Sequence, residues 1–272
     1  MGGTSVVRLI DRSASKPPKC YLDCEADVVE WILKPLSKVE RDTFTSVGAP
    51  SAGKHGSAIH KSFDCSIMDL ADDISFGIHD FEDMIAMKLI SEKDFREQVT
   101  SGSCSAHLDY LKSTYPDEFQ NDIYNKLVDM LFSDSKSRKH AISRMVGFFV
   151  RSCKLITIEE LIDPMVRFRV VMEDGAQTYL KALKDFVRRL VIMSPSVQHL
   201  EFKGQQMVVA VFEALQSEPK TLLPRDTFEK YEASCDGERV ICDHVSGMTD
   251  NFLLKTYERL FSPRMGSVFD KL

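Results

Sequence analysis

The sequence is poor in residues that interrupt regular structure, with 13 glycines, 10 prolines and a single tryptophan among 272 residues. It also lacks any run of the roughly 18 consecutive apolar residues that a membrane-spanning helix needs. Residues 1–15 contain no continuous apolar stretch of the kind found in signal peptides. Since long amphipathic runs dominate what remains, we expect an all-α fold in a cytoplasmic protein with no membrane partner.

Several common site motifs are also missing. The seven cysteines form no CxxC pair and no zinc-finger spacing, which is typical of reduced and mostly buried thiols. The phosphate-binding motifs GxxxxGK[ST] and GxGxxG are absent, as are GxSxG and HExxH. A net charge of −6 does not indicate a nucleic-acid surface. A functional site must therefore be sought among side chains outside these motifs.

The order of the amphipathic runs predicts the organisation of the chain. Residues 1–19, with Gly2-Gly3 and Lys16-Pro-Pro-Lys19, are typical of a flexible lead-in, and we expect residues 20–272 to form a single helical domain. The alternating β-branched residues near 155–172 favour at most a short β-hairpin. We expect helices over residues 25–36, 57–89, 117–132, 136–153, 176–193, 197–215, 225–234 and 239–261, and a further helix that opens at Ser91.

The most informative stretch lies between residues 65 and 85. Read as a helix at about 100° per residue, it has two faces. The apolar face contains Ile67, Leu70, Ile74, Ile78, Phe81 and Ile85, and the opposite face contains Asp69, Asp72, Phe76, Asp80 and Asp83. Like charges three or four residues apart cost roughly 0.2–0.5 kcal/mol per pair, a cost that a cation, a metal or a polar ligand would remove. A solvated acidic face would give the same pattern.

Two further groups of residues are weaker candidates. His79-Asp80 is a His-Asp dipeptide of the kind that metal phosphohydrolases of the HD superfamily use. Its partners would be an upstream histidine, His55 or His60, and a downstream aspartate, Asp122 or Asp129. A histidine on a helix surface beside an acid explains the same dipeptide. Arg144 and Arg151 are seven residues apart on one expected helix face, where they could bind phosphate oxygens or simply face solvent.

The stretch from Cys65 to Asp83, CSIMDLADDISFGIHDFED, resembles the helix "ADDIAYSVHDLED" of the deoxynucleotide triphosphohydrolases, the dGTPase-like branch of the HD superfamily. Three later stretches agree with that family in order and spacing, so the resemblance covers roughly residues 20–265. They are Leu183–Val187 (LKDFV), Leu200–Gln205 (LEFKGQ) and Val240–Phe252 (VICDHVSGMTDNF), the last of which runs into Tyr257–Phe261.

The resemblance implies an HD-domain-like helical bundle and a hydrolase that converts a deoxynucleoside triphosphate into a deoxynucleoside and triphosphate. It implies a divalent metal such as Mg²⁺ or Mn²⁺, with Asp72 as one ligand. The next family residue, a tyrosine that packs on the sugar and touches phosphate, falls on Phe76, which has no hydroxyl. The aspartate that binds the sugar 3′-hydroxyl falls on Asp80.

The sequence also departs from the family. The family's first metal histidine, its His-Asp pair and its catalytic acid–base residues lie farther upstream than the 71 residues that precede Asp72 here, and those residues contain no His-Asp pair. We therefore expect the C-terminal portion of a dNTP triphosphohydrolase, with one metal ligand of the family's four and no assigned catalytic residue. The divalent metal belongs to the complete family site, and this chain by itself need not bind one. Since one carboxylate does not hold a catalytic metal, little or no hydrolysis is expected from this polypeptide alone.

Two alternatives remain open at this point. The chain could be a non-catalytic oligomerisation or regulatory subunit, which would join a second copy of itself or a complete dNTP triphosphohydrolase. Its mark would be an apolar patch where a partner packs. The chain could instead be a separate phosphohydrolase that uses His79 and Asp80.

Overall fold

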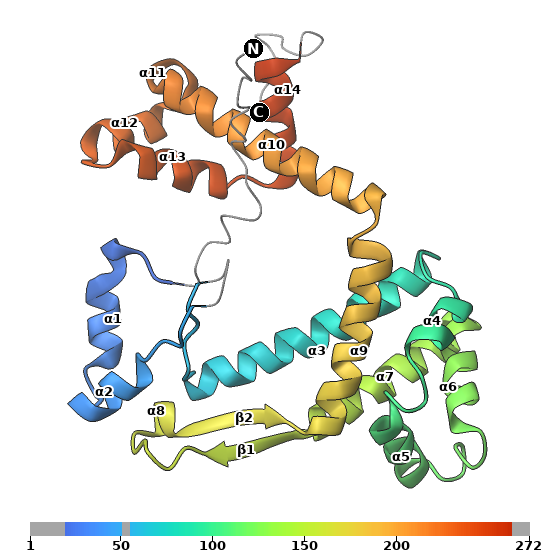
Figure 1. The fold of residues 1–272 in the computed structure, drawn as a ribbon. Coiled ribbons are helices and arrows are strands. Elements are labelled where there is room, and N and C mark those ends of the chain that lie inside the picture. Colours follow the sequence, from blue (N-terminus) through green and yellow to red (C-terminus); the bar gives the residue numbers. More distant parts are fainter. Residues whose placement is uncertain (1–19, 51–54, 263–272) are drawn as a thin grey trace, which may run out of the picture. The chain divides into compact units, whose positions relative to one another are not determined.

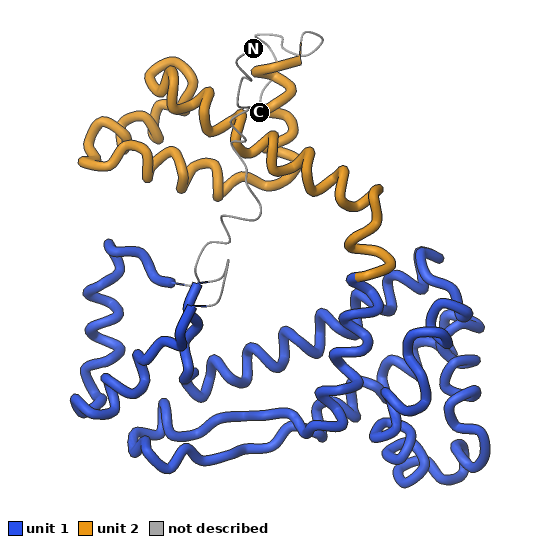
Figure 2. Tube along the Cα trace, in the orientation of Figure 1, with its two compact units in different colours: residues 1–188 blue, residues 189–272 orange. Residues whose placement is uncertain are grey.

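The computed structural model describes residues 20–50 and 55–262, and the expected lead-in over residues 1–19 lies outside this range. The chain divides into two compact units, one reaching residue 188 and the other beginning at residue 189 (Figure 2). Each unit is described by itself below. A single domain over residues 20–272 stays a prediction.

The all-α expectation is confirmed, because one two-stranded antiparallel hairpin is the sole sheet among the described residues. The first unit contains η1 (Asp23–Glu25), α1 (Ala26–Leu33), α2 (Lys38–Phe44), α3 (Phe63–Ala86), α4 (Glu92–Gln98), α5 (Ser105–Thr114), α6 (Ile123–Phe132), α7 (Ser135–Arg151), β1 (Cys153–Thr157), α8 (Pro164–Arg167), β2 (Phe168–Met172) and α9 (Asp174–Val187). The π-helical turn η2 (Arg188–Ile192) follows at the boundary. The second unit contains α10 (Pro195–Ser217), α11 (Pro219–Leu222), α12 (Arg225–Ala233), α13 (Gly237–Ser246) and α14 (Asp250–Phe261).

Local capping explains where the helices depart from their expected bounds. Helix α3 begins at Phe63 rather than near residue 57, because the Ser62 hydroxyl accepts a hydrogen bond from the Cys65 backbone N–H. The helix expected over 239–261 is two helices, because Thr249 caps a new start at Asp250. The helix expected from residue 117 begins at Ile123, after Asp122 takes a left-handed conformation with φ of 50°.

The core of the first unit lies around α3, which packs against α7, α9 and β2 (Figure 1). The expected apolar face of α3 is buried from Ile74 onward, whereas Ile67 at its start is 44% exposed. Rings from three helices meet in this core: Phe81 lies 5.4 Å from Phe95 and 6.3 Å from Phe186 between ring centroids. This packing fixes the rotation of α3, and hence which of its residues face outward.

The expected β-hairpin is confirmed, and its first strand begins at Cys153. Cys153 pairs with Met172 and Thr157 with Phe168 at the two ends of the ladder. The Val170 backbone N–H donates to the Ser66 hydroxyl at 2.9 Å, which attaches β2 to the side of α3.

A buried carboxylate holds the loop beyond β1 against α2. Glu40 accepts hydrogen bonds from the backbone N–H groups of Ile162 at 2.8 Å and Asp163 at 2.7 Å. The Ser37 hydroxyl donates to the same carboxylate at 2.8 Å. The backbone donors of Asp163 and Ile162, followed by the Ser37 hydroxyl, lower the pKa of Glu40 from 4.5 to about 2.

The second unit has its own apolar core, to which several of its helices contribute side chains. Its buried residues are Val211, Leu215, Leu223, Ile241 and Val245. Partly buried side chains from α12 and α14, among them Tyr231 and Tyr257, pack around them. Because this cluster lies wholly within residues 211–260, the second unit has an apolar core of its own.

Replacing Gly77 by alanine should destabilise the first unit. A Cβ at Gly77 would lie 2.5 Å from Cδ1 of Leu180 in α9, so the buried Leu180 side chain, or the helix that carries it, would have to shift. Overpacking of this kind costs about 1–3 kcal/mol, of which higher helix propensity returns up to about 1 kcal/mol. Gly204 in α10 is the matched control, because nothing lies within 4 Å of a Cβ there. Thermal unfolding should show Gly77→Ala lowering Tm and Gly204→Ala raising or preserving it; equal effects would contradict the close crossing.

The free energy of unfolding of the first unit should depend on pH through the Glu40 carboxylate. Because the folded-state pKa of Glu40 lies below its value in the unfolded chain, the ionised carboxylate stabilises the fold above about pH 4.5. That contribution is lost as the pH falls from 4.5 towards 2. Urea unfolding between pH 3 and 7 should therefore show a smaller pH dependence for Glu40→Gln than for the wild type over this window. An identical pH dependence for both proteins would contradict the role given to this carboxylate.

Candidate functional site

The candidate site lies along one face of α3, where Asp72, Phe76 and Asp80 follow one another at intervals of four residues. The Asp72 side chain is exposed, Phe76 is 42% exposed and Asp80 is half-buried. Burial raises the pKa of the Asp80 carboxyl, the charge of Asp83 raises it further, and His79 lowers it by a smaller amount. The structure thus places an accessible ring between two carboxylates, one of them partly withdrawn from water.

The carboxylates beside this face are not left uncompensated. Asp73 forms an ion pair with Lys184 of α9, and Asp69 forms one with Lys61, which lies just before α3. The ammonium nitrogen of Lys184 also lies 5.8 Å from the centroid of the Phe76 ring, within reach of a cation–π interaction. The repulsion expected among the acids of α3 is therefore relieved in part by lysines of this chain.

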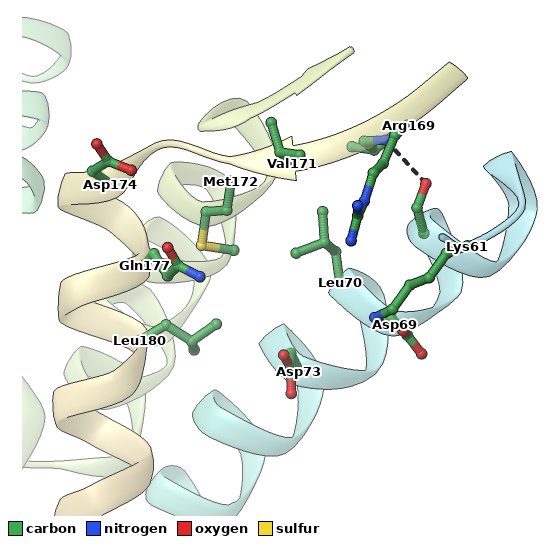
Figure 3. Close-up of a pocket in the computed structure, with 12 residues that line it drawn as sticks. Lys61, Asp69, Leu70, Asp73, Arg169, Val171, Met172, Asp174, Gln177 and Leu180 are labelled. Atoms are coloured by element: carbon green, nitrogen blue, oxygen red, sulfur yellow. Dashed lines mark hydrogen bonds and ion pairs between the residues drawn. The ribbon is translucent and has the colours of Figure 1, made fainter. Parts of the chain in front are cut away.

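A pocket of about 430 Å³ opens between α3, β2 and α9 (Figure 3), and its lining includes Asp69 and Asp73 of α3 but not Asp72, Phe76 or Asp80. Lys61, Asp69 and Asp73 form one wall, and Arg169 reaches toward them from β2. Gln177 and Leu180 of α9 line the opposite side. The pocket contains charges of both signs, and this composition suits a polar ligand better than an apolar one.

We tested whether the residues near Asp72 fit a divalent metal. Within residues 20–50 and 55–262, no group of three or more His, Cys, Asp or Glu side chains is placed to hold an ion. Asp72 is therefore an exposed carboxylate that belongs to no such group in the described chain, and the donor set there does not fit a complete metal site.

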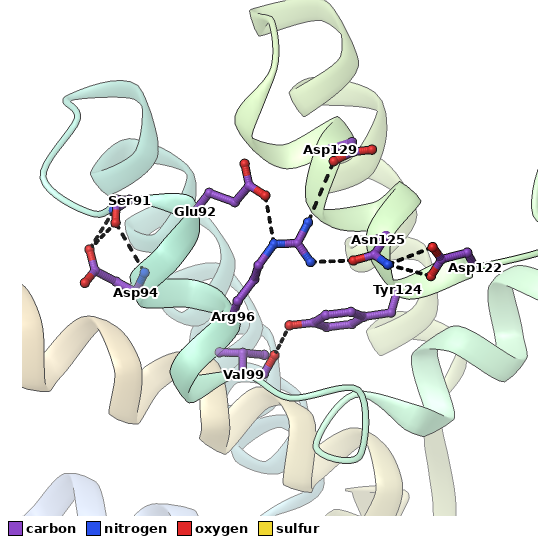
Figure 4. Close-up of polar contacts among 9 residues, drawn as sticks. All are labelled: Ser91, Glu92, Asp94, Arg96, Val99, Asp122, Tyr124, Asn125 and Asp129. Carbon is purple, nitrogen blue, oxygen red and sulfur yellow. Dashed lines mark hydrogen bonds and ion pairs between the residues drawn. The ribbon is translucent and has the colours of Figure 1, made fainter.

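The histidine and aspartate residues of the second candidate set are not brought together. His79 is exposed on α3, whereas Asp122 and Asp129 lie on or next to α6. There Asp122 accepts hydrogen bonds from Asn125, and Asp129 lies 3.8 Å from Arg96 (Figure 4). Within α4, the guanidinium of Arg96 also binds Glu92 at 2.7 Å. Because Asp129 belongs to α6, the contact between Arg96 and Asp129 links α4 to α6. The dipeptide His79-Asp80 and its proposed partners therefore do not form a metal-binding group in the described structure.

Arg144 is engaged within the first unit. Its guanidinium binds the Glu118 carboxylate with both terminal nitrogens, Nη1 at 2.7 Å, and its side chain is 15% exposed. It also lies 4.8 Å from the centroid of the Tyr115 ring and 5.2 Å from that of Phe119. The pKa of Glu118 is lowered chiefly by this arginine. A phosphate contact by Arg144 would have to compete with a bidentate ion pair.

Arg151 lies at the last position of α7 and is exposed. Its charge acts on Tyr110, whose pKa is raised mainly by burial and by the neighbouring Tyr115. Although Arg144 and Arg151 are seven residues apart on one helix, one is tied to Glu118 and the other is open to solvent. A phosphate contact by either residue stays a prediction.

The pairing of Lys184 with Asp73 was not among the expectations from the sequence. One signal was present: Leu183-Lys184 lies in a stretch that matches the family, and Leu180 and Lys184 are one helical turn apart. The sequence did not indicate that the helix carrying Lys184 packs against α3. Gly77 is the residue against which that turn of α9 packs.

Comparison with known proteins defines the class of this protein. Residues 170–259 match the model of the phosphohydrolase-associated domain. The chain is 36% identical, over 97% of its length, to a deoxyguanosinetriphosphate triphosphohydrolase-like protein of Shewanella halifaxensis. It is 35% identical, over 98% of its length, to deoxyguanosinetriphosphate triphosphohydrolase-like protein 2 of Deinococcus radiodurans.

The chain therefore belongs to the deoxyguanosinetriphosphate triphosphohydrolase-like family. It spans 58% of the length of each of these two relatives. Among the helices that the structure describes, none is long and apolar enough to cross a membrane. The family expected from the helix at residues 65–83 is thus confirmed over the part of the relatives that the chain matches.

Proposed function

We propose that this chain contains the sugar-binding part of a deoxynucleoside triphosphate triphosphohydrolase site. In this proposal Phe76 stacks on the deoxyribose, Asp80 accepts a hydrogen bond from the 3′-hydroxyl, and Asp72 is one ligand of a divalent metal such as Mg²⁺ or Mn²⁺. The reaction of the whole site converts a dNTP into a deoxynucleoside and triphosphate. Arg144 and Arg151 remain weaker candidates for phosphate contact.

The observation that supports this proposal is the arrangement of the three residues on α3. An aromatic ring with 42% exposure is uncommon on a helix face that is otherwise acidic, and it offers a flat surface for a sugar. Asp80 lies one turn away, where its carboxylate can accept a hydrogen bond from a hydroxyl on that sugar. Membership of the family gives this arrangement a specific substrate class.

We further propose that the described chain by itself hydrolyses dNTPs slowly or not at all. This proposal is supported by the finding that, among the residues that the structure describes, Asp72 belongs to no group of three or more His, Cys, Asp or Glu side chains that could hold an ion. Metals that activate water in hydrolases are held by three or more protein ligands. Binding of the sugar and hydrolysis of the triphosphate are therefore separable properties of this polypeptide.

A hydrolysis assay tests this division. With dGTP and either Mg²⁺ or Mn²⁺, the chain should release little or no triphosphate, and Asp72→Ala should not change that result. Binding of deoxyguanosine should nevertheless be weakened by Phe76→Ala and by Asp80→Asn, about tenfold each, with exposed Asp83→Asn as the control. Robust turnover that disappears in Asp72→Ala would overturn the inactivity proposal. Binding that ignores both Phe76 and Asp80 would overturn the site itself.

A second function is favoured by the outer face of α1. Val28, Trp31 and Ile32 are three and four residues apart, so they share one face, and they are 51%, 74% and 42% exposed. The inner face of the same helix, with Val29 and Leu33, packs on the cluster around Leu161. An apolar face of this kind is suited to a protein partner, either a second copy or a complete family member.

Size-exclusion chromatography separates this second function from the first. If the chain is an oligomerisation or regulatory subunit, it should elute as a homo-oligomer or in a complex with a complete triphosphohydrolase of the family. Trp31→Glu should then shift the elution to the monomer position, because it places a charge in an apolar interface, whereas Glu30→Gln should not. A monomer at all concentrations, with and without the complete enzyme, would exclude the subunit function.

A further inference from the structure

Lys184 reaches the candidate site because α3 has no side chain at Gly77. A Cβ at that position would lie 3.4 Å from Cγ of Lys184 and 2.5 Å from Cδ1 of Leu180. The stem of Lys184 therefore lies directly against the backbone of α3, one turn beyond Asp73 and next to Phe76. Its ammonium group is held between a carboxylate and an aromatic ring of the facing helix.

A pocket of about 450 Å³ lies beside this ammonium group. Its polar lining consists of Lys181 and Lys184, the Gln177 amide, the Thr178 hydroxyl and the carboxylates of Asp73 and Asp185. The pocket is large enough for a phosphate group, and its ammonium, amide and hydroxyl groups can donate to one, although two carboxylates stand beside the two lysines. It shares Asp73, Gln177 and Leu180 with the pocket shown in Figure 3.

The present partner of Lys184 is weakly held. The side chains of Lys184 and Asp73 are 32% and 51% exposed, and ion pairs as open as this contribute little stability. An anionic group of higher charge, presented on the sugar that stacks on Phe76, would compete with Asp73 at little cost. Lys184 also supplies a hydrogen-bond donor next to a ring that has none of its own.

We propose that Lys184 and the adjoining pocket form an anion subsite that binds a phosphate group of the deoxynucleoside triphosphate. This proposal rests on the sugar-binding function proposed above, since it requires a nucleotide at Phe76. Lys184 exchanges its ion pair with Asp73 for the phosphate when the nucleotide binds. It is a positioning residue for the phosphates and takes no covalent part in the reaction.

The test compares a ligand with phosphates and one without. Equilibrium binding of dGTP and of deoxyguanosine is measured on the full chain without added divalent metal. Lys184→Gln should weaken dGTP binding about tenfold while deoxyguanosine binding stays within about twofold, and Lys184→Arg should restore most of the loss. Lys154→Gln is the matched control, because Lys154 is also an exposed lysine in an ion pair, with Glu173, but lines neither pocket.

Asp73→Asn gives the opposite change and does not depend on the stability of the Lys184 variants. It removes the competing carboxylate and a like charge from the subsite, so dGTP binding should tighten several-fold while deoxyguanosine binding is unchanged. Equal losses of both ligands in Lys184→Gln, or no loss of either, would overturn the subsite. So would weaker dGTP binding in Asp73→Asn.

The two proposals fail in different ways. If deoxyguanosine binding depends on Phe76 and Asp80 but dGTP binding ignores Lys184, the sugar site stands and the anion subsite is wrong. If the wild-type chain binds neither ligand, both proposals are overturned.

Discussion

The close crossing of α3 and α9 at Gly77 is the contact on which the candidate site depends. Because Gly77 has no side chain, Leu180 and Lys184 of α9 lie against the α3 backbone. Leu180 is buried in the core, whereas the Lys184 side chain is partly exposed. The inward side continues into the aromatic cluster of Phe81, Phe95 and Phe186. Because cores pack at nearly crystalline density, this contact also sets the rotation of α3 and therefore the exposure of its polar face.

Lysines form ion pairs with two of the carboxylates on or beside that face. Asp69 and Asp73 are paired with Lys61 and Lys184, whereas Asp72 at the outer edge is open to solvent. Half-exposed ion pairs contribute little stability, so their arrangement adds little to the fold. One of them, the pair of Asp73 and Lys184, holds an ammonium group within reach of the Phe76 ring.

Much of the fold could be predicted from the sequence because its signals are local. The 3.6-residue period of α3 predicted the buried positions from Ile74 to Ile85, and the alternating residues near 155–172 predicted the hairpin. The errors arose where a single side chain ended or began a helix, as Ser62 and Thr249 do. For the site, the spacing of Asp72, Phe76 and Asp80 placed them on one face, but their exposure depends on which other helices cover α3.

The sequence by itself determined the family, the helical class and the order of the polar residues along α3. Four short stretches carry the family resemblance, and the periodicity within single elements carries the helical class and the polar face. Only the tertiary structure decided what those residues meet. It paired Asp73 with Lys184, which is 111 residues away, tied Arg144 to Glu118 and left Asp72 open. The physical reason is that helix periodicity fixes a face, whereas the partner of that face depends on how side chains from distant segments pack together.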